Sequence, residues 1–455
     1  MFNSIRGENS NVEILPLITG TPSDFEDIIF RRGEDEWNAR VGADYEFPFW
    51  DGSLKLIGNH RSEHSPILSI RREFVDDIIV EEVTNDNVED EGETIARAEY
   101  SWKTDRGSDL QLSAEGAFNF LEEDQTLSTL TQINDTISNR VEERRAEATL
   151  AYGRALTPKF DLQSSIGVEY SELTESSSER LDETVRDFIR PKGFVSGAYK
   201  WDDSFTIRTR IEREVGQLDF GDFISVNDLQ DGQDTSDAVD LVPEQSWLGN
   251  IEFEKRYGED INFIANFYGA LVSDTVDFTV TEDGNIAVGN LDSQATRYGI
   301  EFVAAGKLDR FGLNGVQADF ELNVEENNIE DPVTLEDRRL SGTQIYYWRV
   351  NYRHDIPSTQ WAYGGFISLG DTSPTFRPDN ITSDVEIRPR TSIFIEHKDI
   401  FGLKARATLL NLVNNFDDFE RQEFTDFRNI GVIETIEENE LRSGLFFRLA
   451  ISGTF

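Results

Sequence analysis

In residues 445 to 455, a mostly apolar set of side chains alternates, residue by residue, with a more polar set. One face would present Leu445, Phe447, Leu449, Ile451, Gly453 and Phe455, and the other Phe446, Arg448, Ala450, Ser452 and Thr454. A period of two is typical of a β-strand whose faces meet different surroundings. In a soluble protein such a terminal strand would be an aggregation-prone edge, whereas a closed barrel pairs the last strand with the first. The pattern therefore favours a transmembrane β-barrel with a terminal aromatic residue at the rim of its apolar band.

The same alternation recurs throughout the chain. One face is apolar and the other charged or polar at residues 37–47, 96–103, 110–120, 316–325 and 346–353. This is the pattern of a wide barrel with lipid outside and water inside. Counting back from Phe455 gives roughly 17 or 18 strands, the first near 25–32. Residues 54–75 form either one long strand or two strands with a bend at Pro66.

The gaps between these segments are alternately short and long. The short gaps hold Asp, Gly and Pro, which supply turn dihedrals, at 47–52, 104–107, 156–159, 201–204, 257–260, 354–358 and 398–402. The long gaps are polar, at 79–92, 121–142, 173–189, 216–245, 327–342, 370–387 and 415–440. We therefore expect an all-β fold, a transmembrane antiparallel up-and-down β-barrel of roughly 18–22 strands with short periplasmic turns and long extracellular loops. The barrel would cover residues 25–455, and residues 1–24 would be an irregular N-terminal segment or remnant.

Composition narrows the alternatives. The mean hydropathy is −0.48, and no run of about 18 apolar residues exists, which excludes helical membrane spans. The chain has no cysteine, so disulfides and thiolate metal sites are excluded. The net charge of −45 argues against nucleic-acid binding.

Two acidic runs, 81–91 and 227–240, are interpreted as solvated loop tips. The alternative is divalent-ion bridging to lipopolysaccharide, or weak calcium binding. The acidic spacing in the second run does not match an EF-hand loop, so no metal site is expected.

No residues are assigned to catalysis or to a cofactor, because the sequence has no nucleophile elbow, P-loop or zinc-protease motif. His60 and His64 would share a strand face about 13 Å apart, so a common metal ion would require a bend, and a polar strand end is the favoured interpretation. Six arginines that should face the lumen alternate with acidic residues: Arg40, Arg97, Arg208, Arg210, Arg349 and Arg353. They predict ion-pair ladders inside the barrel, with a path for anionic ligands as the alternative.

Three stretches together resemble the TonB-dependent outer-membrane receptor family. They are 241–246, with Pro243 and Glu244; 290–301, with Tyr298, Gly299 and Glu301; and 410–417, with Asn411, Leu412 and Phe416. Their order ahead of a terminal Phe is fairly specific. The resemblance implies a barrel of about 22 strands with an N-terminal plug. It also implies import of a scarce ligand, such as an iron chelate, cobalamin or a glycan, energised by TonB.

No plug, TonB box or signal peptide is recognisable, so we expect a fragment that lacks its plug. The resemblance implies the outer membrane of a Gram-negative bacterium as the location, with outer-membrane lipid and lipopolysaccharide as surroundings. It further implies TonB as a partner through the missing plug segment, a small-molecule or glycan ligand, and an assembly signal read by the barrel assembly machinery, formed by Phe447, Leu449, Ile451 and Phe455. The alternatives are a passive porin and, less favoured, a barrel enzyme with a Ser–His pair at its rim.

Overall fold

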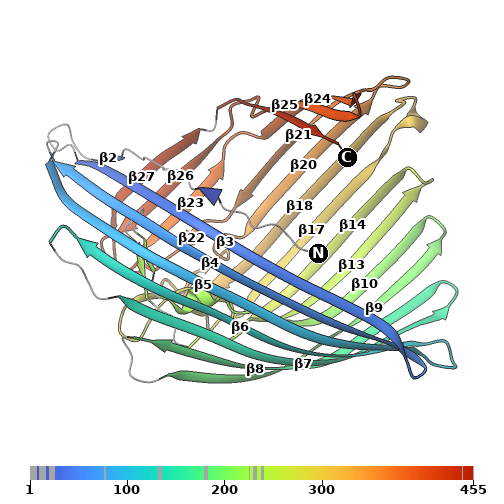
Figure 1. Cartoon of the computed structure of the whole chain (residues 1–455), viewed down its shortest axis with the longest axis horizontal. Coiled ribbons are helices and arrows are strands. Elements are labelled where there is room, and N and C mark those ends of the chain that lie inside the picture. Colours follow the sequence, from blue (N-terminus) through green and yellow to red (C-terminus); the bar gives the residue numbers. More distant parts are fainter. Residues whose placement is uncertain are drawn as a thin grey trace.

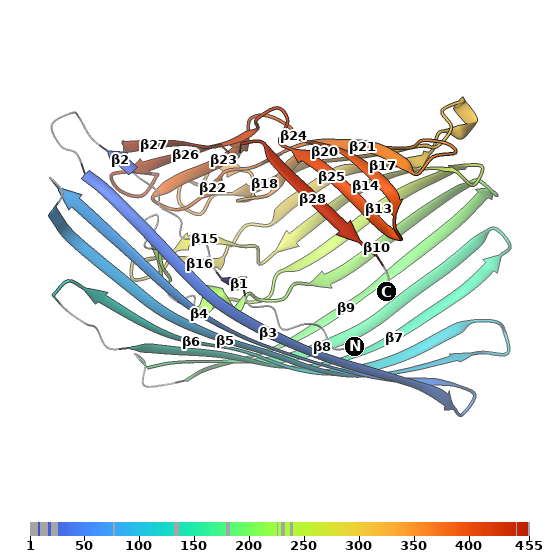
Figure 2. The ribbon, with the colours of Figure 1, turned by 45° about the horizontal axis from the view of Figure 1, so that its top comes forward.

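The computed structural model describes residues 8–9, 17–19, 26–75, 78–131, 136–178, 183–224, 226–228, 233–236, 240–442 and 444–453. One curved sheet forms the wall of a barrel around a wide lumen (Figures 1 and 2). The sheet holds twenty strands, of which β1 (Glu8–Asn9), β2 (Leu17–Thr19) and β19 (Asp337–Arg338) are very short. The fold class is therefore confirmed, and among the described residues no helix is long and apolar enough to cross a membrane.

Seventeen long strands make up the wall, and each pairs antiparallel with the next. They are β3 Glu26–Phe49, β4 Gly52–Val75, β5 Ile78–Lys103, β6 Asp109–Thr129, β7 Ile137–Thr157, β8 Phe160–Ser177, β9 Thr184–Asp202, β10 Phe205–Val215, β13 Gln245–Tyr257, β14 Ile261–Ser273, β17 Ala295–Lys307, β18 Val316–Glu330, β20 Gln344–Asp355, β21 Trp361–Thr372, β24 Arg390–Ile400, β25 Leu403–Leu410 and β28 Phe446–Ser452. The seventeen strands match the 17 or 18 counted back from Phe455 but fall just below the 18–22 expected for the barrel, and the first expected strand, near 25–32, is the beginning of β3, which also contains residues 37–47. The stretch around Pro66 is one continuous strand, in which Pro66 lies opposite Val88.

Smaller elements occupy the end of the barrel that carries the long connections. They are β11 Val226–Asp228 with β12 Gln233–Thr235, β15 Val276–Val280 with β16 Ile286–Asn290, and a four-stranded sheet of β22 Thr375–Phe376, β23 Asn380–Glu386, β26 Phe416–Phe424 and β27 Ile433–Arg442. Two 3₁₀ turns, η1 (Phe220–Phe223) and η2 (Asp309–Phe311), lie in connections. The predicted short turns all join wall strands at the opposite end; Gly107, for example, has φ 75° in the β5–β6 turn, a conformation that glycine adopts without steric cost.

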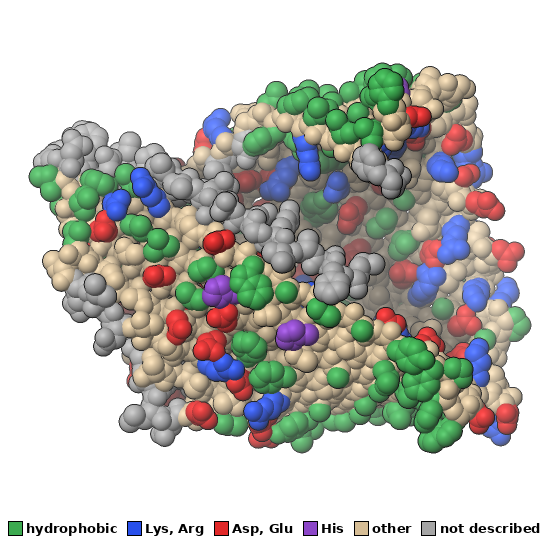
Figure 3. Space-filling model, viewed as in Figure 1, with side chains coloured by type: hydrophobic (Ala, Val, Ile, Leu, Met, Phe, Trp, Pro, Cys, Tyr) green, Lys and Arg blue, Asp and Glu red, His purple; other side chains and the backbone are tan. Residues whose placement is uncertain are grey.

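The two faces of the wall follow the predicted alternation. Tyr45 lies opposite Leu56 across β3–β4, and Leu56 lies opposite Ala98 of β5, on an outer face where the large side chains are exposed. On the lumen side, Arg97 lies opposite Glu115, and its Nε donates to the carboxylate at 2.6 Å. Figure 3 shows apolar side chains gathered on the outer surface near the short-turn end of the wall.

Three of the long gaps expected from the sequence are mostly continuations of wall strands. Residues 79–92 lie within β5, and much of 121–142 and 173–189 belongs to β6, β7, β8 and β9. Beyond the apolar band, water contacts both faces of a strand, so the period-two signal disappears while backbone pairing continues. In this outer part Arg71 donates to Glu81 at 3.0 Å, so part of the first acidic run forms cross-strand ion pairs instead of loop tips.

The described sheet does not close on itself, contrary to the expectation that the last strand pairs with the first. β28 pairs with β25 alone, and the second edge of β3 carries only β1 at Asp35 and Glu36 and β2 at 26–28. With seventeen antiparallel strands, the first and last run in the same direction, so an antiparallel ladder between them is geometrically impossible. The space-filling view shows the hollow interior through this opening (Figure 3).

Candidate functional site

A loop folds into the lumen directly after β10. The N–H of Gly216 donates to the backbone oxygen of Glu244 at 2.7 Å, which ties the start of the whole β10–β13 connection to its end. η1 then begins at Phe220, and the Asp219 carboxylate caps it by accepting the N–H of Gly221 at 2.9 Å. We call residues 216–224 the inward loop.

The inward loop is anchored by a small apolar core. Phe223 is 1% exposed and packs with Val141, Leu173 and Leu241. Arg186 of β9 lies over the Phe223 ring at 5.3 Å and donates to the Leu241 backbone oxygen at 2.8 Å. Because these contacts join three wall strands to the loop, they hold it against the inner wall.

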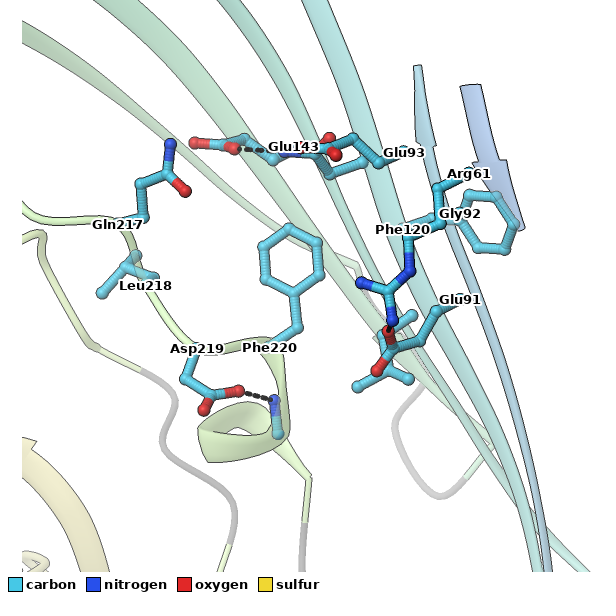
Figure 4. Close-up of a pocket in the computed structure, with 13 residues that line it drawn as sticks. Arg61, Glu91, Gly92, Glu93, Phe120, Glu143, Gln217, Leu218, Asp219 and Phe220 are labelled. Atoms are coloured by element: carbon cyan, nitrogen blue, oxygen red, sulfur yellow. Dashed lines mark hydrogen bonds and ion pairs between the residues drawn. The ribbon is translucent and has the colours of Figure 1, made fainter. Parts of the chain in front are cut away.

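A cavity of about 400 Å³ lies between the inward loop and the wall. Figure 4 shows Arg61, Glu91, Glu93 and Glu143 reaching toward it from β4, β5 and β7, with the ring of Phe220 opposite them. We call it the loop cavity. Its wall residues share the inward face of neighbouring strands, as the cross-strand pairs of Arg61 with Glu93 and of Asn119 with Glu143 show.

The loop cavity has a polar lining in which acidic side chains outnumber the one basic side chain, Arg61. Arg61 forms an ion pair with Glu63 and lies 3.9 Å from Glu91. Asn119 donates to Glu143 at 3.1 Å. The chemistry suits a polar ligand that offers hydrogen-bond donors or positive charge, with an aromatic surface on one side.

In η1, next to the cavity-lining residues 219–221, burial raises the pKa of Asp222 to about 6, and the nearby Asp219 charge adds to this effect.

A second cavity of about 460 Å³ lies beneath the four-stranded outer sheet. Its lining includes Tyr347, Arg349, Phe366 and Arg390, with the Arg349 guanidinium 4.7 Å from the centre of the Phe366 ring. Acidic side chains of β23 and β26 complete the lining. This cavity combines both charges with aromatic surface.

Buried ion pairs lock the outer connections to one another. Asp331, after β18, accepts from Arg338 Nε at 2.6 Å and from Arg428 at 2.5 Å. Arg338 also bonds Asp277 of β15 at 3.0 Å. All four side chains are at most 7% exposed. The two guanidinium groups lower the pKa of the Asp331 carboxyl to about 2 despite its burial. We call these four residues the loop lock.

Two of the family-like stretches meet in space. The Asn290 side chain accepts the N–H of Val242 at 2.7 Å and donates to its backbone oxygen at 2.9 Å. Pro243 is buried beside this contact, and burial raises the pKa of Glu244. Tyr298 faces outward, and Glu301 accepts from Asn266 at 3.0 Å. Gly299 is required by close approach, since a Cβ there would lie 2.5 Å from the Tyr268 hydroxyl.

The third stretch builds the connection between β25 and β26. Asn411 has φ 60° and its side-chain oxygen accepts the N–H of Asn415 at 2.6 Å. Leu412 is exposed, and the Phe416 ring lies under the guanidinium of Arg442 at 4.8 Å. None of these eight residues lines the loop cavity. Their contacts shape the connections that carry the cavities.

The cross-strand pairing of β28 shows which way the side chains of the predicted assembly signal point. Leu449 lies opposite Ala407, which lies opposite Ile395 on the outer face, so Phe447, Leu449 and Ile451 point outward and Arg448 inward. Phe455 lies outside the described residues.

Four of the six predicted lumen arginines, Arg97, Arg208, Arg210 and Arg353, form ion pairs with carboxylates, whereas among the described residues Arg40 and Arg349 have no carboxylate at ion-pair distance. Arg208 pairs with Glu252 at 2.6 Å, and Arg353 pairs with Glu396 at 2.8 Å.

His60 and His64 take part in separate hydrogen bonds. His60 bonds Thr94 at 2.9 Å and His64 bonds Asp90 at 2.8 Å, in separate contacts along β4. Across the described ranges, no three acidic or histidine side chains are grouped closely enough to hold a metal ion. Most of the second acidic run, 227–240, falls outside those ranges. The loop cavity was not anticipated, because the residues on its two sides are 74 to 160 positions apart in the chain and no local motif signals their contact.

Comparisons with known proteins place the fold. No family model matches the chain, and no curated protein matches it. The ferric yersiniabactin uptake receptor of Yersinia pestis aligns with a TM-score of 0.64 and 13% identity over 93% of this chain and 62% of that receptor. The copper transporter OprC aligns with a TM-score of 0.60 and 11% identity over 94% of this chain and 75% of the transporter.

The ferric preacinetobactin receptor of Acinetobacter baumannii aligns with a TM-score of 0.59 and 10% identity, over 98% of this chain and 67% of that receptor. This chain therefore spans about 62% of the length of the first of these proteins. The shared part is the β-barrel, and the chain has the barrel fold of TonB-dependent outer-membrane receptors.

Proposed function

We propose that the chain is the barrel part of an outer-membrane receptor that takes up a scarce ligand with energy supplied by TonB. The observation that carries this proposal is the inward loop, which is anchored on buried Phe223 and builds a ligand-sized cavity inside a wide lumen. Locked outer connections and lumen-facing cavities suit capture of one ligand better than free passage of many solutes. The fold shared with named uptake receptors supports the same reading.

The ligand belongs to the iron-chelate, cobalamin or glycan class. Each of these is larger than a simple ion and offers polar groups to the acidic, amide and arginine side chains of the two cavities. A passive porin is the second candidate, and the wide polar lumen is the feature that favours it. An enzyme at the rim is the least favoured candidate, because the similar structures are named as receptors and transporters.

The surroundings and partners follow from the same proposal. The outward apolar face meets outer-membrane lipid and lipopolysaccharide in a Gram-negative bacterium. TonB acts through a plug segment outside these 455 residues. The barrel assembly machinery reads the terminal signal that includes Phe447, Leu449, Ile451 and Phe455.

Energised uptake tests the proposal. Cells that express the whole encoded protein are given one radiolabelled probe of each class: a ferric catecholate, cobalamin and a maltooligosaccharide. We expect one probe to accumulate, and an uncoupler that collapses the proton gradient to abolish its accumulation. Entry of all three that is indifferent to the uncoupler would establish a porin instead.

A further inference from the structure

One row of lumen-facing side chains crosses four neighbouring wall strands at the loop cavity. Arg61 of β4 lies directly opposite Glu93 of β5. Asn119 of β6 lies opposite Glu93 on one side and Glu143 of β7 on the other, and it donates to Glu143 at 3.1 Å. Neighbouring strands are about 4.8 Å apart, so the backbones of Glu93 and Glu143 are about 10 Å apart. The two glutamate side chains can therefore converge on a single group above Asn119.

The negative charge of this row is not balanced within the described part of the chain. Arg61 turns along the wall instead of across the row, because it forms an ion pair with Glu63 and lies 3.9 Å from Glu91. Within the described ranges, no Lys, Arg or His side chain lies at ion-pair distance from Glu93 or Glu143. Both carboxylates line the loop cavity.

The inward loop places an aromatic ring on the facing side. Figure 4 shows the ring of Phe220 turned toward the wall, between Glu143 and the pair formed by Arg61 and Glu91. Phe220 is held there because it packs against the apolar core of the loop. Over the whole lining, four carboxylates face one guanidinium. The face of an aromatic ring attracts a cation, so the ring and the carboxylates favour the same kind of ligand group.

We propose that the loop cavity binds an ammonium group of the ligand, with Glu93 and Glu143 on the wall side and the Phe220 ring on the loop side. An ammonium group has three donors, so it can bond both carboxylates while it contacts the ring. The inference rests on the proposed function, because it names the chemistry that this cavity selects in the imported ligand. It favours a ligand with a positively charged arm over a purely anionic chelate or a neutral glycan.

The site is distinguished by what converges on it, and not by the lack of an ion pair alone. Asp319 and Glu321 of β18 also face the lumen without an ion pair among the described residues, but neither lines the loop cavity or the second cavity. In the second cavity Arg349 and Arg390 offset the acidic lining, and Arg390 forms an ion pair with Glu386. At the loop cavity, carboxylates without a basic partner and an aromatic ring face the same space.

Two matched probes test the proposal. Ferrioxamine B is an Fe(III) trihydroxamate that ends in a primary amine, and its N-acetyl derivative is the same chelate without the positive charge. Their affinities for the whole encoded protein in lipid nanodiscs are measured by isothermal titration calorimetry. We expect the amine form to bind about tenfold more tightly, and the difference to shrink as salt is added. Equal affinities, tighter binding of the N-acetyl form or no binding of the amine form would each overturn the proposal.

Binding and uptake are separate measurements, so the two proposals can fail separately. Amine-dependent binding by a protein that shows no energised uptake would support the ammonium site and contradict the receptor function. Energised uptake by a protein that binds both probes equally would do the reverse.

Three variants assign the preference to the loop cavity. Glu143→Gln still accepts from the Asn119 amide but has no charge, so it should remove most of the preference for the amine form. Phe220→Leu keeps an apolar side chain without the ring and should weaken binding of the amine form alone by about two- to fivefold. Glu321→Gln, on the lumen face outside the cavity, is the matched control and should keep the full preference. A preference that survives unchanged in Glu143→Gln would overturn the assignment.

Discussion

The Asn290 side chain pairs with both backbone polar groups of Val242, at 2.7 and 2.9 Å. It also donates to the backbone oxygen of Asp274 at 2.7 Å. The amide of Asn290 therefore gives the Val242 backbone the hydrogen bonds that a neighbouring strand would otherwise supply. It joins the end of the β10–β13 connection to the β15–β16 hairpin. No other side-chain type of this size offers both a donor pair and an acceptor in one plane.

Replacing Asn290 by Asp should loosen this junction. A carboxylate accepts the Val242 N–H but cannot donate to the two backbone oxygens, so about 1–3 kcal/mol of local stability is lost. Limited proteolysis of the 216–244 connection should become faster in Asn290→Asp. Asn285→Asp, in the exposed turn of the same hairpin, is the control and should be cleaved at the original rate.

The loop lock should fail when one charge is removed. Arg338→Ala leaves Asp277 and Asp331 buried with fewer partners, a cost of about 3–5 kcal/mol. Hydrogen exchange should rise in 331–343 and 425–432, while the β5–β6 ladder is unaffected. Unchanged exchange in both outer segments would show that the four residues are not coupled.

The loop lock should also respond to acid. The pKa of Asp331 is about 2 in the folded protein and about 3.9 in an unfolded chain. A lowered folded pKa contributes stability above pH 4 that is lost as the pH falls toward 2. Protection factors in 331–343, which correct for the intrinsic pH dependence of exchange, should therefore fall over that interval, and Asp331→Asn should show lowered protection already at pH 7.

The inward loop should respond to pH in the opposite sense. The raised pKa of Asp222, about 6, means that docking favours the protonated carboxyl. Stability from this group is complete below about pH 4 and is lost as the pH rises through 6. The protection factors of the amides in 216–224, which remove the intrinsic pH dependence of hydrogen exchange, should therefore fall between pH 5 and 7. Asp222→Asn should abolish the fall; a slope retained in that variant would assign the effect to another group.

Features of the fold and of the candidate site were predictable from the sequence when they depend on neighbouring residues, and were not when they depend on residues far apart in the chain. The two faces of β28 were predictable from the sequence. Leu449 faces lipid and Arg448 faces water, and this difference repeats at every second residue. The outer half of β5 was not, because water on both faces erases the period. The position of Phe220, across the loop cavity from Arg61, was not predictable either, because it depends on the tertiary folding of a polar connection. The Val242–Asn290 pair was visible only as two separate family-like stretches.

The assignment of outward and inward faces in the last strand can be tested by measuring the free energy of unfolding of two variants. Leu449→Arg places a charge on the outer face and should destabilise the barrel by about 2–4 kcal/mol if it lies near the middle of the bilayer. Arg448→Ala removes a lumen side chain and should cost less. Refolding titrations in lipid vesicles measure both values, and equal or reversed costs would mean that the faces are inverted.

The conductance of the 455-residue chain separates a receptor barrel from a porin. Its lumen face is dense in charge of both signs, as with Arg97 beside Glu115 and Arg353 beside Glu396. Such a surface can pair with a plug or with itself but does not narrow the channel. If the chain closes in a planar bilayer, it should form a large, poorly selective pore, because the wall of seventeen long strands surrounds a wide lumen.

The protein with its plug should stay nearly closed under the same voltage. The comparison needs the same lipid and salt for both proteins, since surface charge effects depend on ionic strength. A small, stable and ion-selective conductance from the 455-residue chain would instead show a self-contained porin. That outcome would remove the need for a plug, because the chain itself would then define the narrow path.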